Sequence, residues 1–257
     1  MNGMIVFDIT NKKKALETLS KLLHKESQQI EDYIESHFTD YDAYAFLQEM
    51  GCDPLTIRVE DIELVAMHLT SNDDECAGLK KDGLLNLRTI LTTQNNLTNF
   101  LSEHHIYFDL EKDELTYDGK IYSLKEEPFQ GIYDKIYNKN VIYGFLRVGD
   151  FGYYSAKMQI RPEIITMLAN LFDDENLISF WDLNHDTYLV KFKEPATHFD
   201  YDSFSLSRKN EDIIISLIYF ALDVIALNEQ VEINCNLKPD FCVTPQNILD
   251  IHNFYNN

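Results

Sequence analysis

The spacing of apolar residues predicts that the chain begins with helices. Apolar side chains recur three and four positions apart over residues 15–23, and a similar stripe continues over residues 30–34. Thr39 and Asp40 are typical of a helix start ahead of the apolar residues in 44–50. We therefore expect residues 1–58 to form a helical N-terminal segment.

A strand is the next predicted element. Residues 62–70 are a nearly continuous apolar run that carries His68 and Thr70 toward its end. Residues 75–81 then have the pattern of a short amphipathic helix, and Gly83 is the residue expected to stop it. The pattern thus predicts a strand, a short helix and a glycine turn in close succession.

A small β insert is predicted near residues 106–124. Three short runs, 106–110, 114–117 and 120–124, are rich in aromatic and β-branched residues. Asp118 and Gly119 between the last two runs are typical of a two-residue hairpin turn. These features predict a meander of three strands.

The remaining elements alternate in type. We expect helices over 164–172 and 211–227 and strands over 187–192 and 230–234, while 177–183 fits either type. This order lacks the regular strand–helix rhythm of a doubly wound sheet, so it favours an α+β fold with a mixed sheet. We predict two parts, the helical segment 1–58 and a domain over 59–257 that contains the β insert.

Composition and charge narrow the partners. The chain has 257 residues, and 45% of them are hydrophobic, which is enough for a sizeable core. Its 43 acidic and 22 basic side chains give a net charge of −21, which repels polyanions and makes nucleic acid a disfavoured substrate. Such acidity fits either solubility or the binding of a basic partner.

The sequence also carries expectations about location and redox state. We see neither a membrane-spanning run nor a signal peptide, so a cytoplasmic location without membrane attachment is expected. The four cysteines lack the paired Cys-x-x-Cys spacing of a zinc site, and we expect them to be reduced, small buried residues. Adjacent His104 and His105 would point about 100 degrees apart on a helix, so no metal site is predicted there.

The succession His68-Leu69-Thr70-Ser71, the helix 75–81 and Gly83-Leu84 resembles the first motif of the NAD-dependent ADP-ribosyltransferases. The resemblance is to the branch that includes the DarT toxins and the RNA 2′-phosphotransferases. It implies an ADP-ribosyltransferase-like mixed sheet core that takes NAD as its cofactor. It also implies that His68 bonds a ribose hydroxyl, that Thr70 supports this contact, and that Gly83 belongs to the same cofactor-binding motif.

The resemblance implies two further site elements. Tyr153, Tyr154 and Ser155 are candidates for the aromatic or serine position that frames the nicotinamide. Glu232 is the candidate for the catalytic glutamate near a late strand, and Glu229 is its competitor. Such a carboxylate stabilises the positive charge that develops on the ribose when the nicotinamide bond breaks.

Two functions remain open at this point. The first is an NAD-dependent mono-ADP-ribosyltransferase that modifies a protein or small-molecule acceptor. Such an enzyme fits a bacterial or phage conflict system, as a toxin or in phage defence. The second is a non-catalytic acidic interaction protein, such as an antitoxin, inhibitor or anti-defence component, that binds a basic protein partner. For the second function His68 is an ordinary strand residue and the net charge of −21 matters more.

Overall fold

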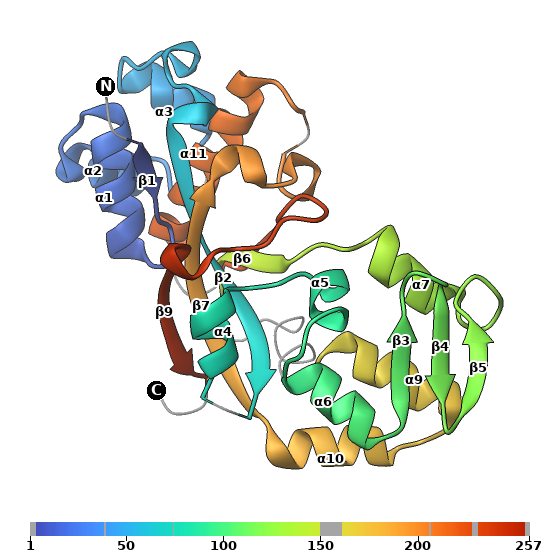
Figure 1. Cartoon of the computed structure of the whole chain (residues 1–257). Helices are drawn as coiled ribbons and strands as arrows, with labels where there is room; N and C mark the ends of the chain where they lie inside the picture. Colours follow the sequence, from blue (N-terminus) through green and yellow to red (C-terminus); the bar gives the residue numbers. More distant parts are fainter. Residues whose placement is uncertain are drawn as a thin grey trace. The chain divides into compact units, whose positions relative to one another are not determined.

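The computed structural model describes residues 4–38, 40–73, 75–149, 161–205, 207–227 and 231–254 (Figure 1). The predicted α+β class is confirmed. Internal contacts divide the chain into two compact units. Unit 1 comprises Met1–His68, Tyr143–Gly152 and Lys191–Leu237, and unit 2 comprises Leu69–Ile142, Tyr153–Val190 and Lys238–Asn257. The predicted boundary after residue 58 falls inside unit 1.

Helices are present where the apolar spacing of residues 15–23, 30–34 and 44–50 predicted them, and strand β1 (Ile5–Phe7) precedes the first of them. The described helices of unit 1 are α1 (Lys12–Leu23), α2 (Ser27–Ser36), α3 (Ala43–Glu49) and α11 (Asn210–Leu227). In the described part of unit 1 four short 3-10 turns accompany them, η1 (Pro54–Thr56), η2 (Val59–Asp61), η3 (Ala196–His198) and η4 (Tyr201–Ser203). Helix α11 packs against α1, α2 and α3. Its apolar residues are buried along most of its length.

The strands of the main sheet follow the order β8-β6-β2-β7-β9, and β1 pairs in parallel with β2. The strands are β1 (Ile5–Phe7), β2 (Ile62–Asn72), β6 (Tyr143–Arg147), β7 (Asp186–Pro195), β8 (Ile233–Asn236) and β9 (Ile248–Asn253). Strands β2 and β7 each run from one unit into the other. The late strand expected over 230–234 is β8, two to three residues further along the chain.

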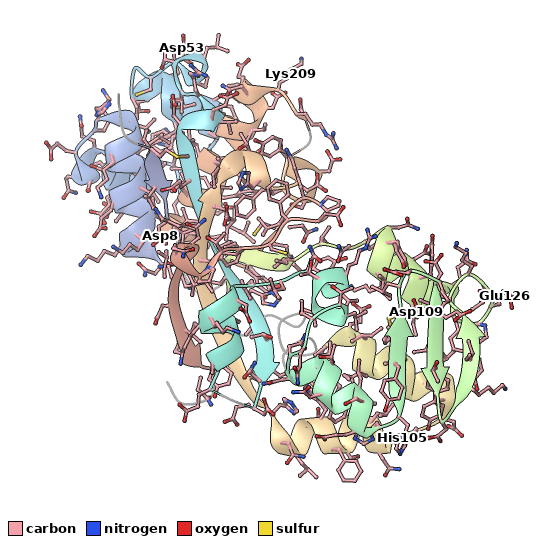
Figure 2. The ribbon with its side chains drawn as sticks, in the orientation of Figure 1. Asp8, Asp53, His105, Asp109, Glu126 and Lys209 are labelled. Atoms are coloured by element: carbon pink, nitrogen blue, oxygen red, sulfur yellow. The ribbon has the colours of Figure 1, made fainter. Side chains whose placement is uncertain are left out.

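Asp8, which follows β1 in Figure 2, joins two strands of unit 1. Its carboxylate accepts hydrogen bonds from Lys191 Nζ at 2.9 Å and from the Thr10 hydroxyl at 2.6 Å. Burial raises the pKa of Asp8, but these hydrogen bonds outweigh it and the pKa is lowered overall. The Asp8 carboxylate is therefore ionised at neutral pH.

Unit 2 contains the predicted meander, which is confirmed as β3 (Ile106–Asp109), β4 (Glu114–Tyr117) and β5 (Lys120–Ser123). Asp118 and Gly119 turn the β4–β5 hairpin with φ values of 47° and 78°. Two positive φ angles are those of a type I′ turn, which matches the twist of the flanking strands. In Figure 1 the three strands lie side by side.

Most of the described helices of unit 2 pack with the meander in one core, to which α4 (Ala77–Asp82) adds no buried residue. The other described helices of this unit are α5 (Leu87–Leu91), α6 (Asn96–Glu103), α7 (Gln130–Tyr137), α9 (Glu163–Phe172) and α10 (Asn176–Asn184), and the 3-10 turn η6 (Pro245–Asn247) precedes β9. The ambiguous run 177–183 is thus helical. Pro162 is the N-cap of α9, and the helix begins at the next residue.

The core of unit 2 centres on the one tryptophan of the chain, Trp181. Trp181 is 1% exposed, and its indole Nε1 donates a hydrogen bond to the Ser71 hydroxyl at 2.9 Å. The ring stacks on His185 at a centroid distance of 3.6 Å and meets Phe100 edge to face at 5.0 Å. The indole therefore has a partner for its one polar group, and aromatic rings contact its face and edge.

None of the helices in the described ranges combines the length and apolar composition needed to cross a bilayer.

Candidate functional sites

His68 is held on β2 by a hydrogen bond to the neighbouring strand. Its Nδ1 lies 2.7 Å from the backbone carbonyl of Tyr143. Met67 is paired with Phe145, so the antiparallel register puts Gly144 opposite His68. Gly144 lies close to both neighbouring strands, because a Cβ at this position would be 3.0 Å from the Met67 carbonyl oxygen and 3.5 Å from Cys235 Sγ.

The contact of His68 with the Tyr143 carbonyl fixes the protonation state of the imidazole. A carbonyl oxygen only accepts, so Nδ1 carries the proton and Nε2 of the neutral ring keeps its lone pair. Burial lowers the pKa of His68, and the hydrogen bond to Tyr143 opposes this effect only in part. At neutral pH His68 is therefore a neutral side chain whose Nε2 can accept a hydrogen bond from a hydroxyl group.

Glu232 lies immediately before β8 in the same unit as His68. It is partly buried, and its Oε2 atom is inaccessible to solvent. The register aligns Gly144 with Cys235, so His68, Gly144 and Cys235 form one row across β2, β6 and β8. Successive side chains of a strand point to opposite faces of the sheet, and Glu232 is three residues before Cys235. If β8 were extended regularly to Glu232, its carboxylate would leave the sheet on the face away from His68.

Gly83 ends α4 in unit 2 with φ 85° and ψ −169°. A Cβ atom at this position would lie 2.0 Å from the carbonyl oxygen of Val243. Leu84 forms an isolated β-bridge with Val243, in which each amide donates to the other carbonyl. The glycine of the motif is therefore required by backbone packing, whatever else it does.

Thr70 is a partly buried residue of β2 and belongs to unit 2, whereas His68 is the last residue of this segment of unit 1. The other predicted site residues, Tyr153, Tyr154, Ser155 and Glu229, lie outside the described residues. Of the predicted constellation, the structure thus describes His68, Thr70, Gly83 and Glu232.

The cysteines differ in burial. Cys76 and Cys235 are buried, as expected, whereas Cys52 and Cys242 are partly exposed. Burial strongly raises the pKa of the Cys235 thiol, so this residue is protonated at neutral pH. His104 packs its ring against Phe100 and Phe180.

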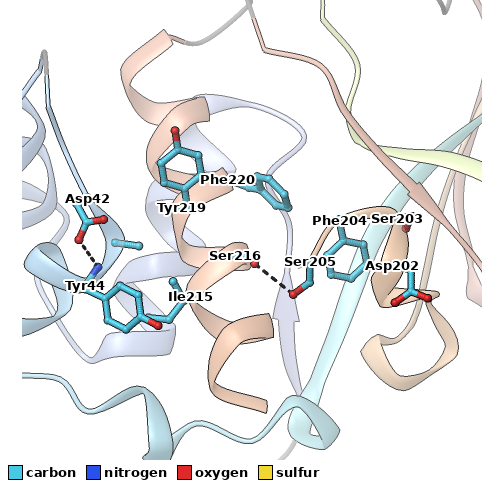
Figure 3. Close-up of a pocket in the computed structure, with 11 residues that line it drawn as sticks. Asp42, Tyr44, Asp202, Ser203, Phe204, Ser205, Ile215, Ser216, Tyr219 and Phe220 are labelled. Atoms are coloured by element: carbon cyan, nitrogen blue, oxygen red, sulfur yellow. Dashed lines mark hydrogen bonds between the residues drawn. The ribbon is translucent and has the colours of Figure 1, made fainter. Parts of the chain in front are cut away.

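A pocket of about 360 Å³ in unit 1 was not predicted from the sequence (Figure 3). Aromatic rings, serines and carboxylates from α3, η4, α11 and their flanking residues line it: Asp42, Ala43, Tyr44, Asp202, Ser203, Phe204, Ser205, Ile215, Ser216, Tyr219 and Phe220. Tyr44 and Tyr219 are 51% and 43% exposed, which is high for aromatic side chains. Tyr219 lies on the polar stripe of α11, whose other apolar residues are mostly buried. An aromatic residue on a polar stripe is the signal by which the sequence could have indicated this pocket.

Acidic groups surround the two tyrosines. Burial and the negative charges of Glu211, Asp212 and Asp42 raise the pKa of Tyr44. The pKa of Tyr219 is raised by Asp223 first, and by burial and Asp42 in addition. The tyrosines are therefore neutral phenols that lie in a negative potential.

No protein-family model, curated protein or solved structure matches the chain.

Proposed function

We propose that this protein is an NAD-dependent mono-ADP-ribosyltransferase with a protein or small-molecule acceptor. The observation that supports this most is the state of His68, a neutral imidazole on β2 whose Nδ1 proton is donated to Tyr143. The Nε2 lone pair is the acceptor that a ribose hydroxyl requires. The resemblance of the segment from His68 to Leu84 to the first transferase motif supports the same assignment.

In this proposal a carboxylate complements the histidine. Cleavage of the bond between nicotinamide and ribose leaves positive charge on the sugar, and the nicotinamide departs with the bonding electrons. A carboxylate fixed near this charge stabilises the transition state more than the ground state. Glu232 and Glu229 are the candidates. In a regularly extended β8 the side chain of Glu232 would point away from His68. Both glutamates therefore have to be tested.

Thermal unfolding with and without NAD tests the proposal directly. A ligand at about 100 times its dissociation constant stabilises a protein by roughly 2.7 kcal/mol, so a clear rise in melting temperature is expected. His68→Gln should remove this rise, because its amide cannot keep both the Tyr143 contact and the position of Nε2. His252→Gln, at another partly buried histidine, should leave it intact.

Release of nicotinamide from NAD then separates the two glutamates. Replacement of the catalytic residue by glutamine should abolish release but preserve the NAD-induced thermal shift. If NAD produces no shift in the wild-type protein, the enzymatic proposal fails. If neither Glu232→Gln nor Glu229→Gln slows release, both assignments of the carboxylate are wrong.

A second candidate function is supported by the charge. A net charge of −21 favours association with a basic protein partner and predicts that such binding weakens steeply as salt is added. Under this function the protein binds its partner without consuming NAD. Retained binding of a basic partner by His68→Gln, together with no thermal shift by NAD, is the result that would select it.

A further inference from the structure

We infer that the pocket of unit 1 between α3, η4 and α11 binds an organic ammonium group, and specifically a lysine side chain presented by a basic protein. This inference is independent of the NAD proposal. It deepens the second candidate function, on which its choice of partner rests, by naming where such a partner is recognised. The pocket is lined entirely by residues of unit 1.

The serine hydroxyls of the pocket offer acceptors and no free donors. The hydroxyl protons of all three lining serines are donated to backbone carbonyls, Ser203 to Asp200 at 2.6 Å, Ser205 to Ser207 at 2.8 Å and Ser216 to Asp212 at 2.8 Å. A hydroxyl whose proton is engaged presents only lone pairs to a ligand. Ser203 and Ser205 already accept from the amides of Asn236 and Ser207, and Ser205 also lies 3.5 Å from the Ser216 hydroxyl. The lone pairs that remain suit a ligand that donates hydrogen bonds.

The backbone amides at the pocket are engaged as well. The amide of Tyr44 donates to the Asp42 carboxylate, and the amides of Ser203, Phe204 and Ser205 donate to carbonyls of the preceding turn. An anion bound here would find few N–H groups to bind it. A phosphate or carboxylate ligand is thus disfavoured by the same geometry that favours an ammonium group.

Aromatic faces complete the recognition of a cation. Tyr44, Tyr219, Phe204 and Phe220 line the pocket, and Figure 3 shows Tyr44 and Tyr219 coming from two different helices. A cation within about 6 Å of a ring centre is attracted by the negative face of the ring. The methylene stem of lysine can at the same time cover the apolar part of these rings.

The charges around the pocket have the required sign. Among the described residues, Asp42, Glu211, Asp212 and Asp223 have no lysine or arginine within ion-pair distance. Asp202 differs, because its carboxylate pairs with both arms of the Arg208 guanidinium at 3.1 and 2.5 Å. Asp42 is thus the lining carboxylate that remains for a ligand. Two backbone amides bond its Oδ1, which leaves acceptor capacity on the group.

An NMR titration with defined peptides tests the inference. The probe is a Gly–Ser peptide with blocked ends and three lysines, and the control peptide carries acetyl-lysine at the same positions. We expect the lysine peptide to shift the amide signals of Tyr44, Ala45, Ser205 and Ser216 first, and the acetylated peptide to leave them unchanged.

Variants then identify the contacts. Tyr44→Leu and Tyr219→Leu keep apolar bulk but remove the ring, and each should weaken binding by about three- to tenfold. Asp42→Asn keeps an oxygen for the helix cap and removes the charge, and a similar loss is expected. The matched controls are Tyr107→Leu, a 52% exposed tyrosine of unit 2, and Asp53→Asn, an exposed capping aspartate seen in Figure 2 that does not line the pocket. Both controls should bind as the wild type does.

Two results would overturn the inference. One is the absence of shifts at the pocket on addition of the lysine peptide. The other is equal affinity of the wild type and the three pocket variants for this peptide. In the second case salt-sensitive binding of the peptide would persist, so the function as a binder of basic proteins would survive and only its assigned site would be lost.

Discussion

At the scale of single residues, Gly83 shows how one missing side chain decides a contact between distant parts of the sequence. Its backbone occupies a region of φ and ψ that is nearly closed to other residues, and the Val243 carbonyl stands where a Cβ would be. The sequence predicted that Gly83 stops a helix, and α4 ends there. The approach of Val243, 160 positions later, could not be predicted, because no local pattern encodes it.

Gly83→Ala should therefore destabilise the protein by about 3 kcal/mol or more, since backbone strain and a steric clash add. Gly119→Ala is the matched control, because Gly119 also has a positive φ of 78° but has open space around its Cβ position. Only the strain is expected there, about 1 kcal/mol. Urea unfolding followed by circular dichroism measures both. Equal losses would contradict the assigned role of Val243.

His68 makes a prediction about pH. The pKa of His68 is lowered in the folded state, so below about pH 6.5 the unfolded chain binds a proton that the native imidazole does not bind. The free energy of unfolding should thus fall as pH decreases from 7 to 5, with at most about 1.4 kcal/mol per pH unit from this residue. His68→Gln lacks this contribution. The difference in stability between wild type and variant should consequently grow from pH 5 to pH 7, and a constant difference would argue against a neutral imidazole at this partly buried position.

At the scale of elements, the helices and strands that have a local sequence signal were predicted well, and the pairing of distant strands was not. The hairpin of β4 and β5 follows from Asp118 and Gly119, because both residues tolerate the required positive φ. The pattern did not predict β1, β6 or β9 as strands. The extended conformation of each depends on partner strands far along the chain.

The start of α3 illustrates the limit of boundary prediction. Thr39 and Asp40 were the expected helix start, but Asp42 is the N-cap, and its carboxylate accepts from the amides of Tyr44 and Ala45 at 2.9 Å each. Asp42→Ala should destabilise the protein by about 1 kcal/mol, whereas Asp42→Asn should change stability by only a few tenths. Chemical unfolding of the two variants measures the difference. Similar losses in both would mean that charge, and not capping, dominates at this residue.

At the scale of the whole molecule, the net charge of −21 predicts a response to salt. Like charges repel in the compact state, and added ions screen them. The exposed ion pairs that salt also weakens contribute little, so the melting temperature should rise with sodium chloride. A scan from low to moderate ionic strength tests this, with potassium chloride as a control for ion-specific effects. A fall in melting temperature would show that attractive pairs outweigh the repulsion.

The pocket of unit 1 could not be predicted from sequence because its walls come from segments about 160 residues apart. Asp42 and Tyr44 belong to the first helices, and Ser205 and Tyr219 belong to the last third of the chain. Only the overall acidity hinted at the class of ligand. His68 was a predicted site residue, and its neutral state follows from the backbone carbonyl of Tyr143, which no motif could indicate.

Because Trp181 is buried, its fluorescence reports on the folding of unit 2. Its indole emission should be blue-shifted in the native protein, since water is excluded from the ring, and should move to longer wavelength when this unit opens. Because unit 1 holds no indole, a comparison of fluorescence with a signal from all peptide bonds would reveal whether the two units lose their structure together.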